Sequence, residues 1–85
     1  MRFVLTRHAQ AEMLRRHIPE TLVNQIAQSP GQIVKEQGDI SCYQSISHEE
    51  DNSYLIRVMI NPTTDPVQIV TVYKTSKIDK YWRMP

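Results

Sequence analysis

The sequence contains little cysteine and glycine and no long apolar run, and each shortage excludes a class of protein. Cys42 is the single cysteine, so no internal disulfide can form, which is typical of proteins in a reducing cytoplasm. Two glycines among 85 residues exclude collagen-like and glycine-rich low-complexity chains. No apolar run approaches the roughly 20 residues of a membrane-spanning helix. Residues 1–10 also lack the apolar core of a secretory signal, so we expect a cytoplasmic protein without a membrane segment.

The composition fits one small globular domain over residues 1–85. Hydrophobic residues make up 40% of the chain and charged residues 22%, and both values are ordinary for such a domain. The net charge of +1 hides an uneven distribution. Residues 1–17 and 53–85 are each rich in arginine and lysine, whereas residues 18–52 are acidic. A local basic surface forms if the two ends meet in the fold.

The first third of the chain has the pattern of two helices. Thr6 is a suitable N-cap for a helix over residues 7–16. Pro19 is a good first-turn residue for a second helix, which runs to about Gln28 and is stopped by the sequence Ser29-Pro30-Gly31.

The rest of the chain has the two-residue period of strands. The predicted strands cover residues 32–37, 40–47, 54–60 and 67–75, and Gly38-Asp39 forms a tight turn between the first two. Short connections favour antiparallel pairing. We therefore predict an α+β domain in which two N-terminal helices pack on one face of an antiparallel sheet of about four strands. The other face of the sheet is then available for binding.

His8 is the residue with the clearest chemical potential. It lies one turn into the first predicted helix, beside Arg7 and on the same helix as Arg15 and Arg16. An imidazole that moves a proton, together with guanidinium groups that neutralise phosphate, suffices for RNA cleavage without a metal, because the RNA supplies its own 2′-hydroxyl nucleophile. The alternative is a histidine that only caps or packs the helix.

Arg57 interrupts an otherwise apolar strand. It is either a solvent-facing residue that guards against aggregation or a ligand-facing residue on an open sheet. Further hydroxyl and cationic groups on the last strand and its exit complete a candidate substrate surface, namely Thr71, Tyr73, Thr75 and Lys77. The aromatic pair Tyr81-Trp82 either stacks on bases or pins the C-terminus to the core.

The histidines and the cysteine do not have the spacing of a metal site. His8, His17, Cys42 and His48 match no zinc pattern, and the sequence has no glycine-rich phosphate loop. We therefore expect neither a metal nor a cofactor.

Several segments, in order, are similar to a family of small bacterial proteins catalogued as domain of unknown function 4258. These segments are Thr6-Arg7-His8-Ala9, Met13 with Arg16 and Ile18, Val34 to Gln44, Leu55 to Val58, and Ile69 to Lys77 with Tyr81-Trp82. Glu12 and His17 stand where the family usually has arginine and glycine.

That family resembles RelE/ParE-type toxins within the ribonuclease fold of barnase and the colicin tRNases. The resemblance implies a RelE-like or microbial ribonuclease-like fold, a small antitoxin partner, and metal-independent endoribonuclease activity on RNA by 2′-hydroxyl attack. By position, it implies that His8 is the acid–base residue and that Arg16 and Arg57 are phosphate ligands. Thr71 and Tyr73 are then sheet-face supports, and we group Arg7, Arg15, Thr75 and Lys77 with them as substrate-binding residues.

Two alternatives to the enzyme stay open. In one, the same sheet face binds a protein and the domain is a non-catalytic interaction module. In the other, the chain is a ParE-like inhibitor that acts only by binding. Glu12 favours these alternatives, because a carboxylate repels phosphate and can hold Arg16 in an ion pair.

Overall fold

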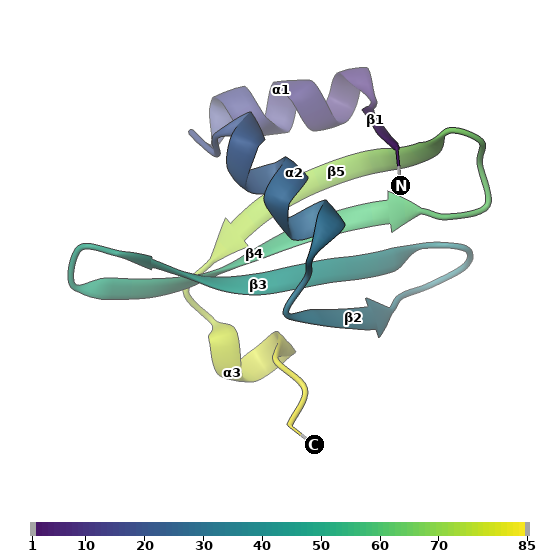
Figure 1. The fold of residues 1–85 in the computed structure, drawn as a ribbon. Coiled ribbons are helices and arrows are strands. Elements are labelled where there is room, and N and C mark those ends of the chain that lie inside the picture. Colours follow the sequence, from purple (N-terminus) through teal and green to yellow (C-terminus); the bar gives the residue numbers. More distant parts are fainter. Residues whose placement is uncertain (1, 85) are drawn as a thin grey trace.

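A computed structural model describes residues 2–84 as one layered α+β unit (Figure 1). Its elements, in chain order, are β1 (Phe3–Leu5), α1 (Arg7–Arg15), α2 (Glu20–Gln28), β2 (Gln32–Lys35), β3 (Ser41–Glu49), β4 (Asn52–Asn61), β5 (Val67–Thr75) and α3 (Ile78–Tyr81). The strands form one sheet in the order β1-β5-β4-β3-β2. The four strands from β2 to β5 pair in antiparallel fashion, and β1 pairs in parallel with β5.

The prediction of two N-terminal helices on an antiparallel sheet of about four strands is therefore wrong. The chain opens on a strand, the sheet is mixed and has five strands, and a third helix follows β5. The first strand has only three residues, and its partners, Val67 to Ile69, lie more than sixty positions later. A local period carries no information about such a pairing, which depends on contacts far apart in the sequence.

Thr6 is the N-cap of α1, as predicted. Its hydroxyl accepts a hydrogen bond from the amide of Ala9 at 3.1 Å, which confirms the N-cap. The same hydroxyl donates to the carbonyl of Val70 at 3.2 Å, and the Thr6 amide donates to the carbonyl of Ile69. One residue therefore starts the helix and attaches it to β5, along which α1 packs (Figure 1).

The two long helices share one core with the central strands. Its buried residues are Ala9, Met13, Ile18, Val23, Ile26 and Ala27 from the helical region, and Ile56, Val58, Ile60, Ile69 and Val72 from β4 and β5. Because side chains alternate along a strand, the residues between them, such as Arg57, point to the opposite face of the sheet.

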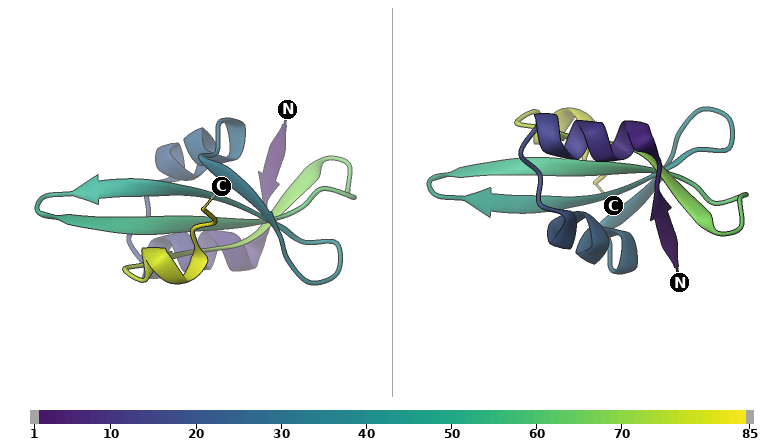
Figure 2. Two further views of the ribbon diagram at one scale, coloured as in Figure 1. Left: turned by 90° about the horizontal axis from the view of Figure 1, so that it is seen from below. Right: turned by 90° about the horizontal axis from the view of Figure 1, so that it is seen from above.

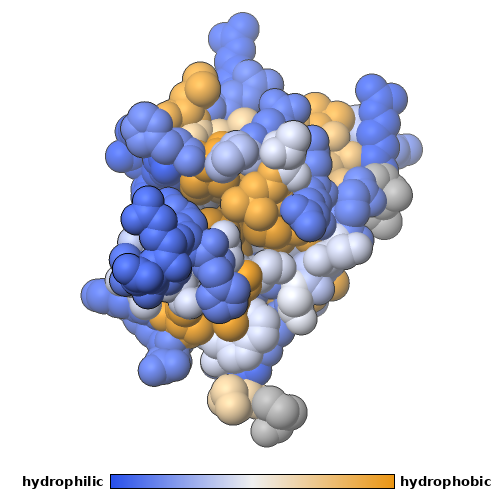
Figure 3. All heavy atoms as spheres, turned by 60° about the vertical axis from the view of Figure 1, so that its left-hand side comes forward, coloured by the Kyte–Doolittle hydropathy of each residue, from blue (hydrophilic) through white to orange (hydrophobic). Residues whose placement is uncertain are grey.

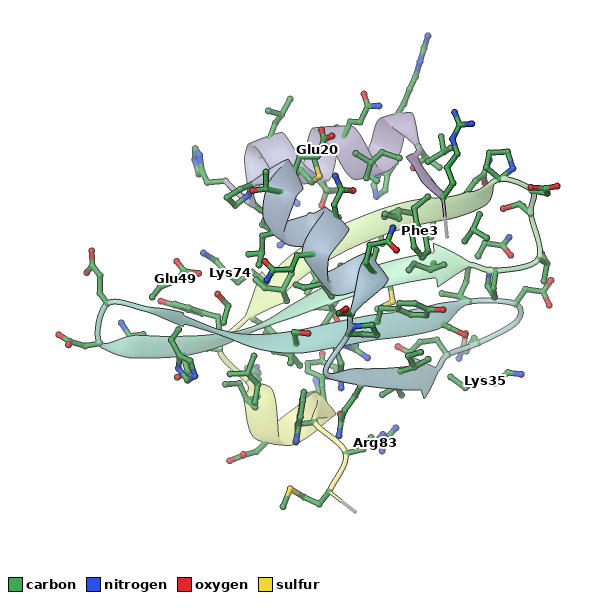
Figure 4. The ribbon with its side chains drawn as sticks, viewed as in Figure 1. Phe3, Glu20, Lys35, Glu49, Lys74 and Arg83 are labelled. Atoms are coloured by element: carbon green, nitrogen blue, oxygen red, sulfur yellow. The ribbon has the colours of Figure 1, made fainter. Side chains whose placement is uncertain are left out.

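That opposite face is not left open, contrary to the prediction. Figure 2 views the sheet edge-on and shows α1 and α3 on the other side of it from α2, so the two long helices do not pack on one face as predicted. Figure 3 shows apolar patches among hydrophilic residues on the side toward which the β3–β4 hairpin projects. In Figure 4, Glu49 of that hairpin lies beside Lys74 of β5, and the two form an ion pair at 3.0 Å. No helix within residues 2–84 is both long and apolar enough to cross a membrane.

Candidate functional site

Arg57 lies at the centre of a polar cluster on the α3 side of the sheet. The strand register places it between Gln44 of β3 and Tyr73 of β5. Its Nε donates to Gln44 Oε1 at 2.8 Å, and one of its terminal nitrogens donates to the Tyr73 hydroxyl at 2.6 Å. Arg57 is only 3% exposed. Three adjacent strands thus hold one guanidinium group in a fixed position.

A carboxylate neutralises this buried cation. Glu36, which follows β2, accepts a hydrogen bond from the third nitrogen of Arg57 at 3.3 Å. Burial by itself lowers the pKa of Arg57. The hydrogen bond to Tyr73 and the charge of Glu36 act in the other direction, and the net pKa lies above its ordinary value. The guanidinium therefore stays charged.

Arg16, the C-cap residue of α1, completes the cluster. Its guanidinium carbon lies 5.9 Å from the centre of the Tyr73 ring, and that of Arg57 lies 5.7 Å from the same ring. Burial raises the pKa of Tyr73, so its hydroxyl stays protonated. We call Arg16, Glu36, Gln44, Arg57 and Tyr73 the Arg57 cluster.

Glu12 binds Arg16, as the spacing in the sequence suggested. One of its oxygens accepts from Arg16 at 3.0 Å, and both oxygens accept from Arg15. Hydrogen bonds from Arg15, and then from Arg16, lower the pKa of Glu12 to about 2. Two arginines thus share one carboxylate, and this group of three residues keeps a positive charge.

His8 is not part of the Arg57 cluster. It is exposed in the first turn of α1, and Arg16 lies eight positions later in the chain. That separation corresponds to roughly 12 Å of helix rise. Among residues 2–84, the His8 side chain makes no hydrogen bond, ion pair or ring contact. The structure therefore brings together Arg16, Arg57 and Tyr73 of the predicted site, but not its predicted acid–base residue.

The other predicted substrate-binding residues border the cluster or lie away from it. Arg7 and Lys77 are exposed, and Thr71 shares a strand face with Tyr73. Thr75 has a local role, because its hydroxyl accepts a hydrogen bond from the Lys77 amide at 3.1 Å ahead of α3.

Sequence reasoning missed Glu36, Gln44 and Tyr81 as partners of Arg57. Tyr81 of α3 lies over the cluster, with its ring centre 4.3 Å from the guanidinium carbon of Arg57. The sequence does hold one indication of the role of Gln44. A glutamine in a predicted strand needs a hydrogen-bond partner when it is buried. Its cross-strand position opposite Arg57 becomes visible only once the register is known.

The histidines, the cysteine and the acidic residues are spread over the fold. Among the residues that the structure describes, no three His, Cys, Asp or Glu residues are grouped as metal ligands would be. Cys42 is fully buried, and burial raises its pKa to about 11. Two surface hollows lie elsewhere, one between α2 and β3 and one beside Phe3 and Ile33.

Comparison with known families identifies the family of the chain. Residues 5–74 match the family described as Domain of unknown function (DUF4258). The chain belongs to this family. No curated protein and no solved structure gives a significant match. The DUF4258 match includes every residue of the Arg57 cluster and ends before α3, so Tyr81 lies outside it.

Proposed function

We propose that this chain is a toxin-like, metal-independent endoribonuclease domain of a toxin–antitoxin type system, related to RelE and ParE toxins and active in the bacterial cytoplasm. The observation that carries the proposal is the Arg57 cluster. Two arginines lie against one tyrosine ring, and a carboxylate contacts one of them.

The chemistry of this cluster supports the proposed binding of RNA. Tyr73 offers an aromatic ring on which a base of single-stranded RNA can stack, and Arg16 offers a charge for the neighbouring phosphate. Arg16 keeps about a third of its side chain exposed despite its contact with Glu12. A small antitoxin protein that covers this face would block both contacts.

Cleavage requires a group that accepts the proton of the 2′-hydroxyl. In this proposal Glu36 takes that role in place of His8, because its carboxylate lies 3.3 Å from Arg57. The 2′-oxygen attacks the phosphorus, the bond to the 5′-oxygen breaks, and that oxygen takes a proton from solvent. Arg16 and Arg57 stabilise the negative charge that develops on the phosphate oxygens. The products are a 2′,3′-cyclic phosphate and a 5′-hydroxyl end.

The binding step is tested with Arg16→Gln. We expect this variant to bind a single-stranded oligouridylate more weakly than the wild type and to lower the salt dependence of binding by about one phosphate contact. Arg15→Gln is the matched control, because Arg15 contacts Glu12 and is 63% exposed. Equal loss of affinity in both variants would indicate a general charge effect without a site at Tyr73.

A non-catalytic interaction module is the second candidate, and one observation favours it. Each of the three nitrogens of Arg57 has an internal partner, and the side chain is almost completely buried. In that case the Arg57 cluster holds the sheet together, and a protein partner binds the surface around it. The domain then binds no RNA, and a ParE-like inhibitor would act in the same way.

A further inference from the structure

The C-terminal segment covers the Arg57 cluster without being part of the core. We define residues 78–83 as the lid. Its helix, α3, has four residues, none of them buried. Figures 1 and 2 show it on the far side of the sheet from α2, followed by a chain end that leaves the domain.

A small set of contacts attaches the lid. The carbonyl of Tyr81 accepts from Gln44 Nε2 at 3.2 Å. Gln32 accepts from the Arg83 amide at 3.0 Å and donates to the Arg83 carbonyl. Figure 4 shows Arg83 below the sheet, where the chain leaves α3. The Trp82 ring packs close to Gly31, where a Cβ would lie 3.1 Å from it. These partners belong to β2, β3 and the turn before β2.

The cation beneath the lid does not depend on it for position. Gln44, Tyr73 and Glu36 hold Arg57 through hydrogen bonds, and none of these residues belongs to the lid. The Tyr81 side chain contributes a ring contact with the guanidinium, and it lies edge-to-face with Tyr73, with which its hydroxyl also interacts. Gln44 loses its bond to the Tyr81 carbonyl when the lid is released, but its Nε2 also donates to Gln32 Oε1 at 2.9 Å. Release of the lid should therefore uncover Arg57 while its hydrogen bonds stay in place.

The Tyr81 ring occupies the place that a nucleobase would take. An aromatic ring over a guanidinium is the arrangement by which arginine binds the bases of single-stranded RNA. We propose that the lid is an internal competitor of RNA, and that single-stranded RNA binds Arg57 by displacing Tyr81. This inference rests on the proposed function, because it concerns access to the same site.

The position of the lid can be measured without RNA. Trp82 is the only tryptophan of the chain, so its fluorescence reports on the lid alone. Tyr81→Ala and Gln32→Ala should shift its emission to the red. Tyr81→Ala loses the contact between the Tyr81 ring and Arg57. This loss should also increase the hydrogen-exchange rate of the Trp82 backbone amide by about fivefold. That amide donates to the Ile78 carbonyl at 2.8 Å.

Matched controls separate the lid from general destabilisation. Tyr81→Phe keeps the ring and should behave as the wild type. Tyr54→Ala removes another tyrosine that contacts a cation, Lys74 at 4.9 Å, and Gln68→Ala removes a strand glutamine that does not contact the lid. Neither should change Trp82 emission. Unchanged Trp82 emission in both Tyr81→Ala and Gln32→Ala, with melting temperatures close to that of the wild type, would contradict the proposal that residues 78–83 act as a lid.

Titration with a short oligouridylate tests the competition. RNA should shift Trp82 emission of the wild type to that of Tyr81→Ala, and Tyr81→Ala should bind RNA about fivefold more tightly because no ring has to be displaced. RNA binding without a change in Trp82 emission and without a gain in Tyr81→Ala would refute the lid and leave the proposed function standing. Absence of RNA binding by all variants, including those with a released lid, would refute the proposed function and the competition with it.

Discussion

At the scale of the residue, Arg57 shows that a charged side chain in an apolar strand can belong to the interior. The sequence left open whether it guards an edge or faces a ligand. The structure buries it against Gln44, Tyr73 and Glu36, each of which forms a hydrogen bond with it. Removal of a buried cation leaves its partners unpaired, and this loss is larger than the net stabilisation by the ion pair itself.

Arg57→Ala should therefore destabilise the domain strongly. We expect a loss of about 2–3 kcal/mol in the free energy of unfolding, because the variant leaves Glu36, Gln44 and Tyr73 without their partner. For a domain of this size the melting temperature should fall by roughly 10 °C or more. Arg7→Ala is the control, because Arg7 is exposed and should change stability little. Equal thermal melting curves for Arg57→Ala and the wild type would contradict a structural role.

Glu12 makes the free energy of unfolding depend on pH in the acidic range. Its pKa is lowered from 4.5 to about 2 in the folded protein by hydrogen bonds from Arg15 and then Arg16. The folded state thus favours the charged carboxylate. Its contribution is fully present above pH 4.5 and is lost as the pH falls toward 2.

Urea unfolding across this pH range tests the contribution of Glu12. The free energy of unfolding of the wild type should fall as the pH decreases, and Glu12→Gln should show a smaller fall. Identical pH profiles for the two proteins would mean that the contacts with Arg15 and Arg16 do not stabilise the fold.

At the scale of the element, local patterns predicted what local interactions determine. The two long helices lie within about one residue of their predicted bounds, and the strand over residues 67–75 has the bounds predicted. Capping by Thr6 and the proline before α2 are signals within a few neighbouring residues. The strand β1 and the helix α3 were missed, because each is only three or four residues long and depends on distant partners.

Thr6 makes both a local contact and a contact with a residue far away in the sequence. Its hydroxyl caps α1 and also bonds to β5 through Val70. Thr6→Ala should lower the free energy of unfolding by about 1–2 kcal/mol through loss of the cap. Thr6→Ser keeps the hydroxyl and should restore most of it, as measured by urea unfolding. If Thr6→Ser is as unstable as Thr6→Ala, the stabilisation comes from the methyl group, and the cap has little effect.

At the scale of the whole molecule, the order and register of the strands bring the residues of the site together. Closeness in the sequence has less influence on which residues meet. Arg16, Arg57 and Tyr73 were all chosen from the sequence, and the strand register together with the packing of α1 on β5 brings them together. His8 was chosen because it neighbours Arg7 and begins the same helix as Arg16. A helix separates such residues along its axis, so this closeness in sequence did not become closeness in space. Glu36 could not be predicted, because only the paired strands bring it to Arg57.

RNA cleavage through Glu36 is the central claim, and one measurement tests it most directly. Wild type, Glu36→Gln and His8→Ala would be expressed from an inducible promoter in a bacterial host, and total RNA would be read for new 5′ ends. We expect growth arrest and discrete cleavages with the wild type and with His8→Ala, and neither with Glu36→Gln, which keeps the hydrogen bond to Arg57 but cannot accept the proton. Intact RNA with folded wild type, or cleavage unchanged by Glu36→Gln, would contradict the account.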